Sequence, residues 1–585
     1  MKIKIKCCLS LLSGALAVAI PFTIASCTND SVIAMTAYGR IRGVDQGGIL
    51  SFKGVPYAKN PIGELRFAPP RNPDQWFGVK NCTKYGQACV QDDVGTGWDI
   101  QPQGEDCLNL NIWTPTLSPG RPMAVYVYIH GGVFTVGSGN QGIFDGRNMA
   151  NDLGKKDMVV VDVNYRLHAL GFMALNYLET QALGDLDQPI NDANGKPIMT
   201  DGNWGILDQV KALQWVHKNI KYFGGDATNV TIAGESAGSF SVSSLLISPA
   251  TAPNVQSDGK ELFQRAIMES GNLIGYDAIS SYSKADKLLA IEQCRKMILD
   301  TLHIGDSVLG VQILRYDITA QMLAEWTRIQ WNPVDEPDLE TWNLMPCYDG
   351  WALPADKVAA IKAGKFRNVD IIYGWNTDEG YGFVPDDMPV TEDQFESTIK
   401  WRMSMENASD YITALGGYVK DGGLIPNPVN GSYYLAIRQL IKLSAFAASS
   451  KEFVDQIVNY SALSKKHYAY NFDYRFDYPA EYPTKTGAAH TAELAFVFGN
   501  MMHDNVKAID MSNQVMEYWT NFAKTGNPNS DGLVEWKLDS GNNENNALWF
   551  KGDAFKSDVN NQIIFSEMDE NEAVNAVANF YASQF

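Results

Sequence analysis

The residues with the clearest potential for chemistry lie in the segment FGGDATNVTIAGESAG, residues 223–238, with Ser236 at its centre. The G-x-S-x-G core is typical of a nucleophile elbow, in which a strand turns sharply into a helix and exposes the serine at the turn. Gly234 and Gly238 fit this geometry, because a β-carbon at either position would clash where strand and helix approach each other. On its own the motif also fits an ordinary Gly/Ser turn, so the rest of the chain has to decide.

A nucleophilic serine needs a general base, and the chain has seven histidines. In enzymes with this elbow the acid and then the histidine follow the serine, which leaves His303, His467, His490 and His503. His490 lies in TGAAHTAELAFVFG, between a small-residue turn and an apolar run, where an imidazole on a loop can reach across a site. The alternating pattern around His467 favours a strand, and the other two histidines lie in polar surroundings. We therefore expect His490 to be the base.

The acid that orients the base is expected between Ser236 and His490, after a strand. Residues 370–374 (DIIYG) have a β-prone pattern, and NTDEG follows them closely. Asp378 and Glu379 are the two candidates, and spacing alone does not separate them.

Donors for an oxyanion are also visible. Residues 124–129 (AVYVYI) favour a buried strand and lead into the turn HGGVF. A glycine pair after a strand lets backbone N–H groups point into a cavity. The sequence therefore predicts an oxyanion hole formed by the N–H groups of Gly132, Val133 and Ala237.

These motifs belong to a longer set of blocks that run nearly end to end over residues 32–540. The set is SFKGVPYAKNPIGELRFAPP, EDCLNLNIWTP, the HGG turn, MVVVDVNYRLHALGF, GNWGILDQVKALQWVHKNIKYFGGDATNVTIAGESAG, NTDEG, AAHTAELAFVFG and YWTNFAKTGNPN. With these blocks the sequence resembles the type-B carboxylesterase and cholinesterase family of α/β-hydrolases.

The resemblance implies an α/β-hydrolase fold, with a large, mostly parallel sheet flanked by helices and helical cap segments over a gorge above Ser236. It implies hydrolysis of small carboxylic esters through an acyl-enzyme, without a cofactor. Carried over by motif, the triad is Ser236, Glu379 and His490, and Ser270 in IMESG matches a serine that supports the triad by hydrogen bonds.

Three positions depart from the family pattern. Val133 stands where the family has the third glycine of H-G-G-G, Asn109 replaces the tyrosine of E-D-C-L-Y, and His168 replaces the glycine of Y-R-L-G. None of them removes a catalytic group. We expect them to affect the substrate range, with the branched side chain of Val133 crowding the oxyanion hole.

The N-terminus has the features of an export signal. Lys2, Lys4 and Lys6 precede an apolar stretch that ends in IASC, which resembles a bacterial lipobox. We expect residues 1–26 to be a lipoprotein signal peptide, Cys27 to carry the lipid, and residues 27–585 to form one domain. Thr28 favours the outer membrane or cell surface. An ordinary signal peptide cleaved near Ser26, giving a secreted or periplasmic protein, is the alternative, and Pro21 argues against a retained membrane span.

The cysteines agree with export. Five remain beyond Cys27, namely Cys82, Cys89, Cys107, Cys294 and Cys347. The family joins the cysteine of E-D-C-L to one upstream, which here implies a Cys89–Cys107 disulfide, with Cys82 as a competing partner for Cys107. No cysteine or histidine spacing indicates a metal site.

Charge and pattern limit the other possibilities. The net charge of −20 argues against nucleic-acid binding. The segments 276–343 and 391–464 are helix-rich and predict cap elements, and residues 181–200 predict a surface loop.

Two further functions remain open. Trp98, between Cys89 and Cys107, is compatible with a choline-ester hydrolase that binds a quaternary ammonium by cation–π contact. A catalytically silent adhesion protein is disfavoured, because all three triad residues are present.

Overall fold

The computed structural model describes the following parts of the chain, to which all statements about the structure refer: residues 31–92, 100, 102–151, 154–275, 287–300, 302–326, 344–384, 388–403, 432–461, 464–475, 488–500, 506–539, 547–553, 574–575, 577–579 and 582.

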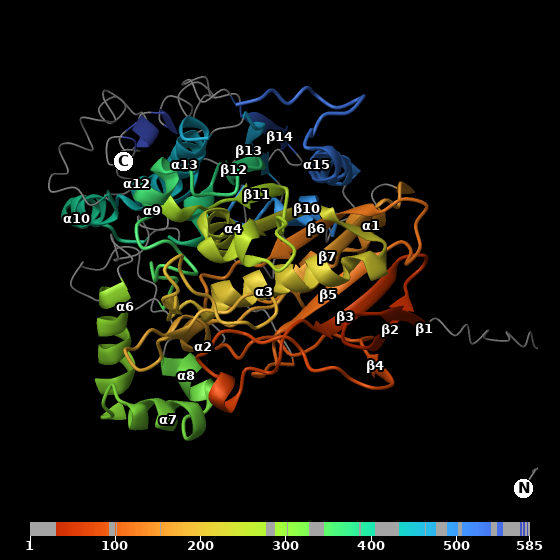
Figure 1. Cartoon of the computed structure of the whole chain (residues 1–585). Coiled ribbons are helices and arrows are strands. Elements are labelled where there is room, and N and C mark those ends of the chain that lie inside the picture. Colours follow the sequence, from red (N-terminus) through yellow and green to blue (C-terminus); the bar gives the residue numbers. More distant parts are fainter. Residues whose placement is uncertain are drawn as a thin grey trace, which may run out of the picture.

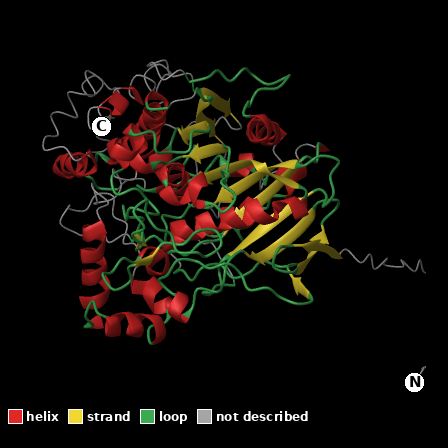
Figure 2. Cartoon of the chain, in the orientation of Figure 1, coloured by secondary structure: helices red, strands yellow, loops and turns green. Residues whose placement is uncertain are grey.

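One large sheet dominates this described part (Figure 2). Its strands are β1 (Ser31–Met35), β2 (Arg40–Asp45), β3 (Leu50–Pro56), β4 (Val79–Asn81), β5 (Asn109–Thr114), β6 (Met123–Ile129), β7 (Met158–Val163), β10 (Gly225–Glu235), β11 (Arg265–Glu269), β12 (Asp370–Asn376), β13 (His467–Arg475) and β14 (Leu548–Asp553). The order across the sheet is β1-β2-β3-β5-β7-β6-β10-β11-β12-β13-β14, with β4 beside β2.

The sheet has two parts of different character. From β7 through β14, every neighbouring pair of strands is parallel. At the other end, β1, β2, β3 and β5 are joined to one another and to β7 by antiparallel pairing. The expected sheet is therefore confirmed in its parallel part, and it is extended by an antiparallel N-terminal part.

Helices cover both faces of the sheet. The main ones are α1 (Arg147–Asn151), α2 (His168–Phe172), α3 (Trp204–Asn219), α4 (Ala237–Ile247), α6 (Lys287–Cys294), α7 (Val308–Tyr316), α8 (Ala320–Trp326), α9 (Lys357–Lys362), α10 (Glu392–Met403), α12 (Tyr434–Ile441), α13 (Ala448–Asn459), α14 (Leu494–Val497) and α15 (Val506–Thr525). In Figure 1, α3 and α4 cross the front of the sheet.

Strand β6 shows why helices must pack on both faces of this sheet. All seven of its residues are buried. Val125 and Val127 face the core that contains α3 and α4, whereas Tyr126 and Tyr128 face a second core that contains α1 and α15. A parallel strand buried on both faces needs a continuous apolar run, and this confirms the strand predicted for residues 124–129.

The helix-rich segments are largely as predicted. The described parts of residues 276–343 form α6, a π-helical stretch (Arg295–Asp300), α7 and α8. Those of residues 391–464 form α10, α12, a second π-helical stretch (Lys442–Ala447) and α13. Residues 181–200 form the predicted loop, closed at its base by a short antiparallel pair, β8 (Thr180–Gln181) and β9 (Met199–Thr200). In the described residues, no helix has the length and apolarity needed to span a membrane.

Candidate active site

Ser236 occupies the sharp turn between β10 and α4. Strand β10 ends immediately before it and α4 begins immediately after it, and Ser236 itself has φ 55° and ψ −123°. A β-carbon on Gly234 would lie 2.5 Å from the carbonyl carbon of Gly238, and one on Gly238 would lie 2.0 Å from the carbonyl oxygen of Ile129. The strand–turn–helix geometry and the need for both glycines are therefore as predicted.

His490 and Glu379 meet directly. The Nδ1 atom of His490 lies 2.6 Å from Oε2 of Glu379, and both side chains are buried, the histidine less completely. Asp378 points elsewhere, because its carboxylate accepts the N–H of Ala488 at 3.0 Å. Geometry thus separates the two acids that sequence spacing could not, and it places Glu379 at the imidazole.

Two further donors fix the Glu379 carboxylate. Ser270 donates its hydroxyl to Oε1 at 2.5 Å, and the backbone N–H of Asn376 donates to the same oxygen at 2.7 Å. Ser270 follows β11 and Asn376 ends β12. The carboxyl ends of neighbouring parallel strands therefore hold the acid in one orientation.

The imidazole of His490 also contacts the residue that precedes the serine. Its Nε2 atom lies 3.2 Å from Oε1 of Glu235, and among the described residues the ring is hydrogen-bonded to Glu379 and not to Ser236. The contact between a nucleophile and its base often tightens only when substrate is bound. The structure brings His490 and Ser236 to the same end of β10, because the imidazole contacts the last residue of that strand, Glu235, and Ser236 follows it.

The turn after β6 lies beside the serine. A β-carbon on Gly131 would be 3.1 Å from Cβ of Ser236. Gly132, Val133 and Phe134 all have positive φ, at 106°, 55° and 60°. Such angles are unusual for a β-branched residue and mark local strain.

Backbone N–H groups in the turn after β6 and at the start of α4 have no acceptor within the described chain. Neither Gly132 nor Val133 donates its N–H to a protein acceptor in the described residues, and the N–H of Ala237 is unpaired by its position as the first residue of α4. Val133 is partly exposed, whereas Phe134 is buried and packs edge-to-face against Phe172.

His130, at the start of the turn, is a structural residue. Its ring stacks on Tyr165 with centroids 4.5 Å apart, and Tyr165 donates its hydroxyl to the His130 carbonyl at 2.9 Å. Burial lowers the pKa of His130 to about 4, so the ring is neutral at neutral pH.

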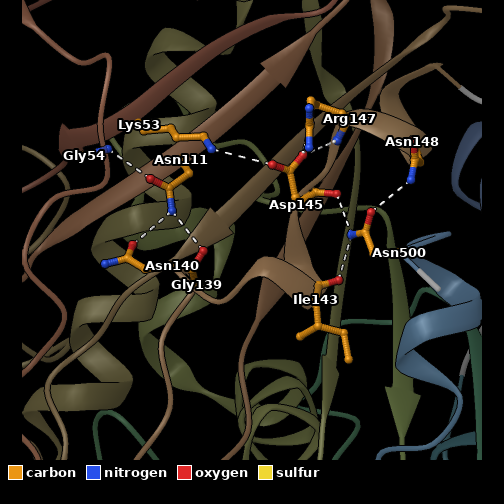
Figure 3. A network of polar contacts seen from close by, with 10 residues as sticks. All are labelled: Lys53, Gly54, Asn111, Gly139, Asn140, Ile143, Asp145, Arg147, Asn148 and Asn500. Atoms are coloured by element: carbon orange, nitrogen blue, oxygen red, sulfur yellow. Dashed lines mark hydrogen bonds and ion pairs between the residues drawn. The ribbon is translucent and has the colours of Figure 1, made fainter. Parts of the chain in front are cut away.

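The chain that follows the turn is anchored on the antiparallel side of the sheet (Figure 3). Asn111 of β5 accepts the N–H of Gly54 at 3.0 Å and donates to the carbonyl of Gly139 at 3.1 Å and to Oδ1 of Asn140 at 3.3 Å. A single buried amide therefore links β3, β5 and the loop after the oxyanion turn.

The same loop is fastened to the chain that follows His490. Asn500 donates to the carbonyls of Ile143 and Asp145, each at 2.9 Å. The Asp145 carboxylate in turn contacts Nζ of Lys53 at 3.6 Å and accepts Nε of Arg147 at 2.8 Å. The segments that carry the base and the oxyanion turn are thus tied together outside the site itself.

A cluster of buried carboxyl groups lies behind the base. Burial raises the pKa of Glu235, Glu269 and Glu493, in the last case to about 7, and the nearness of the other carboxylates raises each further. Glu269 accepts the indole N–H of Trp519 at 2.8 Å. Burial, and to a smaller extent the repulsion between these carboxylates, favours the protonated forms of the three groups beside Glu379.

Sequence reasoning missed several residues of this site. Glu235 stands inside the GESAG motif and Glu493 three residues after His490, so both could have been found by their place in the motifs. The rings of Phe383 and Phe446 each lie 4.9 Å from the imidazole between centroids. Phe446 comes from the segment predicted as a cap, and no local signal marks it.

His168, which stands where the family pattern Y-R-L-G has glycine, connects two segments near the site. Its φ is 43°, and its N–H donates to the carbonyl of Phe134 at 2.7 Å. Its Nε2 contacts the carbonyl of Val90 at 2.5 Å, and burial lowers the pKa of the ring to about 4. His168 therefore links the oxyanion turn, through its backbone N–H, to Val90 next to Cys89, through its neutral ring.

The cysteines are all buried thiols in the described residues. Cys89 and Cys107 are in hydrogen-bond contact, whereas Cys82 lies against the carbonyl of Gly54. The Cys89–Cys107 disulfide stays a prediction. Trp98 and Cys27 lie outside the described residues. Within the described chain no set of three or more His, Cys, Asp or Glu side chains could hold a metal ion.

Comparison with known proteins gives a consistent result. The model of the carboxylesterase family matches residues 30–188 and 194–562. The para-nitrobenzyl esterase of Bacillus subtilis is 31 % identical over 521 residues, which cover 86 % of this chain and 92 % of that protein. The acetylcholinesterase of Electrophorus electricus is 29 % identical over 567 residues, which cover 88 % of this chain and 82 % of that protein.

A solved structure agrees with the sequence matches. The carboxylesterase of Geobacillus stearothermophilus superposes with a TM-score of 0.69 at 29 % identity, covering 89 % of this chain and 96 % of that one.

The two acids can be separated by matched amide substitutions. We expect Glu379→Gln to lower kcat for 4-nitrophenyl acetate on the order of 10³- to 10⁴-fold, because an amide no longer stabilises the imidazolium. Asp378→Asn keeps an oxygen for the N–H of Ala488, so kcat should stay within about threefold of wild type. Steady-state kinetics of both variants, side by side, is the measurement, and the reverse ranking would assign the acid to Asp378.

Proposed function

This chain belongs to the carboxylesterase family and is a carboxylic-ester hydrolase, and we propose that it acts through an acyl-enzyme on Ser236 with His490 as base and Glu379 as acid. The observation that carries the proposal is the 2.6 Å contact between His490 and Glu379 at the strand end where Ser236 occupies its elbow.

In the first step His490 takes the proton of the Ser236 hydroxyl through Nε2 while the oxygen attacks the ester carbonyl. Glu379 holds Nδ1–H, which fixes the tautomer and stabilises the imidazolium. The developing oxyanion is assigned to the N–H groups of Gly132, Val133 and Ala237, which donate to no acceptor in the described part of the chain.

The tetrahedral intermediate then collapses, and His490 gives its proton to the leaving alcohol. In the second step His490 activates a water molecule that attacks the acyl-enzyme, and the proton returns to Ser236 as the acid leaves. The imidazole packs against the rings of Phe383 and Phe446, and these contacts restrict its rotation.

The nucleophile is tested by removing one oxygen. Ser236→Ala should fold normally and lose kcat by about 10⁴-fold or more, because only the chemistry requires the hydroxyl. Ser243→Ala, on the same helix, removes a hydroxyl that only caps the carbonyl of Phe240 and should keep wild-type activity. If Ser236→Ala retained more than about a tenth of wild-type turnover, the nucleophile would be a different residue.

Val133 is proposed to restrict the alcohol part of the ester. Its side chain is partly exposed at the oxyanion turn and stiff at χ1, so a branched alcohol beside the carbonyl would meet it. Its backbone N–H is unaffected, so small unhindered esters should still react well.

Replacing Val133 by glycine should therefore relax the substrate range. We expect the kcat/KM ratio of a primary to a tertiary acetate to fall about 10- to 200-fold in Val133→Gly. The measurement is that ratio in both proteins. An unchanged ratio, with both rates reduced together, would show that Val133 only supports the turn.

We also propose that the enzyme is held at the bacterial cell envelope by a lipid on Cys27, as the lipobox-like IASC indicates. Cys27→Ala should move active enzyme from the membrane fraction to the soluble fraction. Cys8→Ala, which changes a thiol inside the signal segment, should not. Wild-type enzyme that is already soluble would contradict the anchor.

A further inference from the structure

The first strands of the chain expose a mixed apolar and basic surface. In the β1–β2 pair, Ile33 lies opposite Arg42 and Met35 opposite Arg40, and directly opposed residues share one side of a sheet. All four side chains are exposed, with 41 % for Ile33 and 52 % for Met35. The intervening residues are turned to the core, so this side has no cover in the described chain.

Phe77 adds a large apolar group next to this side. It is fully exposed and precedes β4 by two residues. Strand β4 pairs with β2, with Val79 opposite Arg40. We call Ile33, Met35, Arg40, Arg42 and Phe77 the outer face.

The charge of this region is opposite to that of the protein. Strands β1, β2 and β4 carry three basic side chains and one acidic one, whereas the whole chain has a net charge of −20. The ion pairs among the described residues include neither Arg40 nor Arg42. Exposed arginines beside exposed apolar groups suit a partner that is both anionic and apolar, rather than an ordinary acidic protein surface.

The position of the outer face in the chain indicates which anionic and apolar partner it meets. Cys27 precedes Ser31, the first residue of β1, by four residues, so a lipid on Cys27 would keep β1 within about 14 Å of the membrane. Figure 1 shows β1, β2 and β4 together at one edge of the molecule, far from α6 and α10.

We propose that the outer face rests on an anionic lipid bilayer. Ile33, Met35 and Phe77 enter the interfacial layer, and Arg40 and Arg42 bind lipid phosphates. The proposal takes its geometry from the lipid anchor on Cys27, and it adds a defined orientation to what would otherwise be a flexible tether.

This orientation keeps the active site away from the lipid. Between β2 and β10, which leads to Ser236, lie β3, β5, β7 and β6. Five strand spacings amount to about 24 Å. Esters therefore enter from the aqueous side, and changes on the outer face should leave kcat/KM for a soluble ester unchanged.

The test uses enzyme without a lipid. If fractionation shows that the wild type is anchored, this is the Cys27→Ala variant; if the wild type is soluble, it is the wild type itself. The outer face is thereby tested whether or not the anchor exists, since fractionation reports on the anchor separately. Binding is measured by co-sedimentation with vesicles of phosphatidylcholine alone and of phosphatidylcholine mixed with an equal part of phosphatidylglycerol, at low and at physiological salt.

We expect binding to the anionic vesicles only, weakened by salt. Arg40→Glu with Arg42→Glu should lower the partition coefficient on the order of 20-fold or more, about fivefold for each arginine charge lost. Ile33→Ser with Met35→Ser should weaken binding at both salt concentrations. Lys362→Glu with Lys365→Glu makes the same charge change on exposed residues at α9 and should have no effect.

Three results would overturn the proposal. The first is no binding to the anionic vesicles, and the second is equal weakening by the Lys362/Lys365 pair. The third is that analytical ultracentrifugation shows a dimer for the unsubstituted outer face and a monomer for the outer-face variants. This face would then be a contact between two copies of the chain. Unchanged melting temperature and kcat/KM in each variant show that the fold is intact.

Discussion

A single residue, Ser236, connects strand β10 to helix α4, and the rest of the site is arranged around that turn. Gly238 lies against the end of β6, whose chain then forms the oxyanion turn. Ser236 donates its N–H to the carbonyl of Glu269, and Ser270 donates its N–H to the carbonyl of Gly374, each at 2.9 Å. These bonds continue the parallel register beyond the strand ends, so the serine, its neighbour on β11 and the acid after β12 are positioned by one sheet.

Buried carboxyl groups surround the histidine that the sheet positions. Glu379 contacts the imidazole, while Glu235, Glu269 and Glu493 crowd the same buried space and have raised pKa values. An imidazolium that forms at His490 during turnover is therefore paired with the Glu379 carboxylate, since the raised pKa values of the other three groups favour their neutral forms. When His490 is neutral, the close packing of these buried carboxyl groups lowers the stability of the fold, and this loss is the cost of keeping them at the catalytic site.

The sequence was informative where function requires particular residue types in fixed local order. The elbow, the strand before the oxyanion turn and the candidate histidine were all recognisable from short motifs. Asp378 and Glu379 are adjacent, and only the path of the chain after β12 decides which one reaches His490. Phe446 and Asn500 were not foreseeable, because their roles depend on tertiary contacts with segments far away in the sequence. The antiparallel extension by β1, β2, β3 and β5 was not predicted either, although β1, β2 and β3 follow one another closely in the chain and pair as neighbours.

The most direct test of this account is to trap the acyl-enzyme. Wild-type enzyme is mixed with a slowly hydrolysed acetate ester, quenched with acid during turnover, digested and mapped by mass spectrometry. The account predicts one acetyl group on the peptide that contains Ser236, in an amount equal to the burst of released alcohol. An acetyl group on another residue, or a burst without any acylated protein, would contradict it.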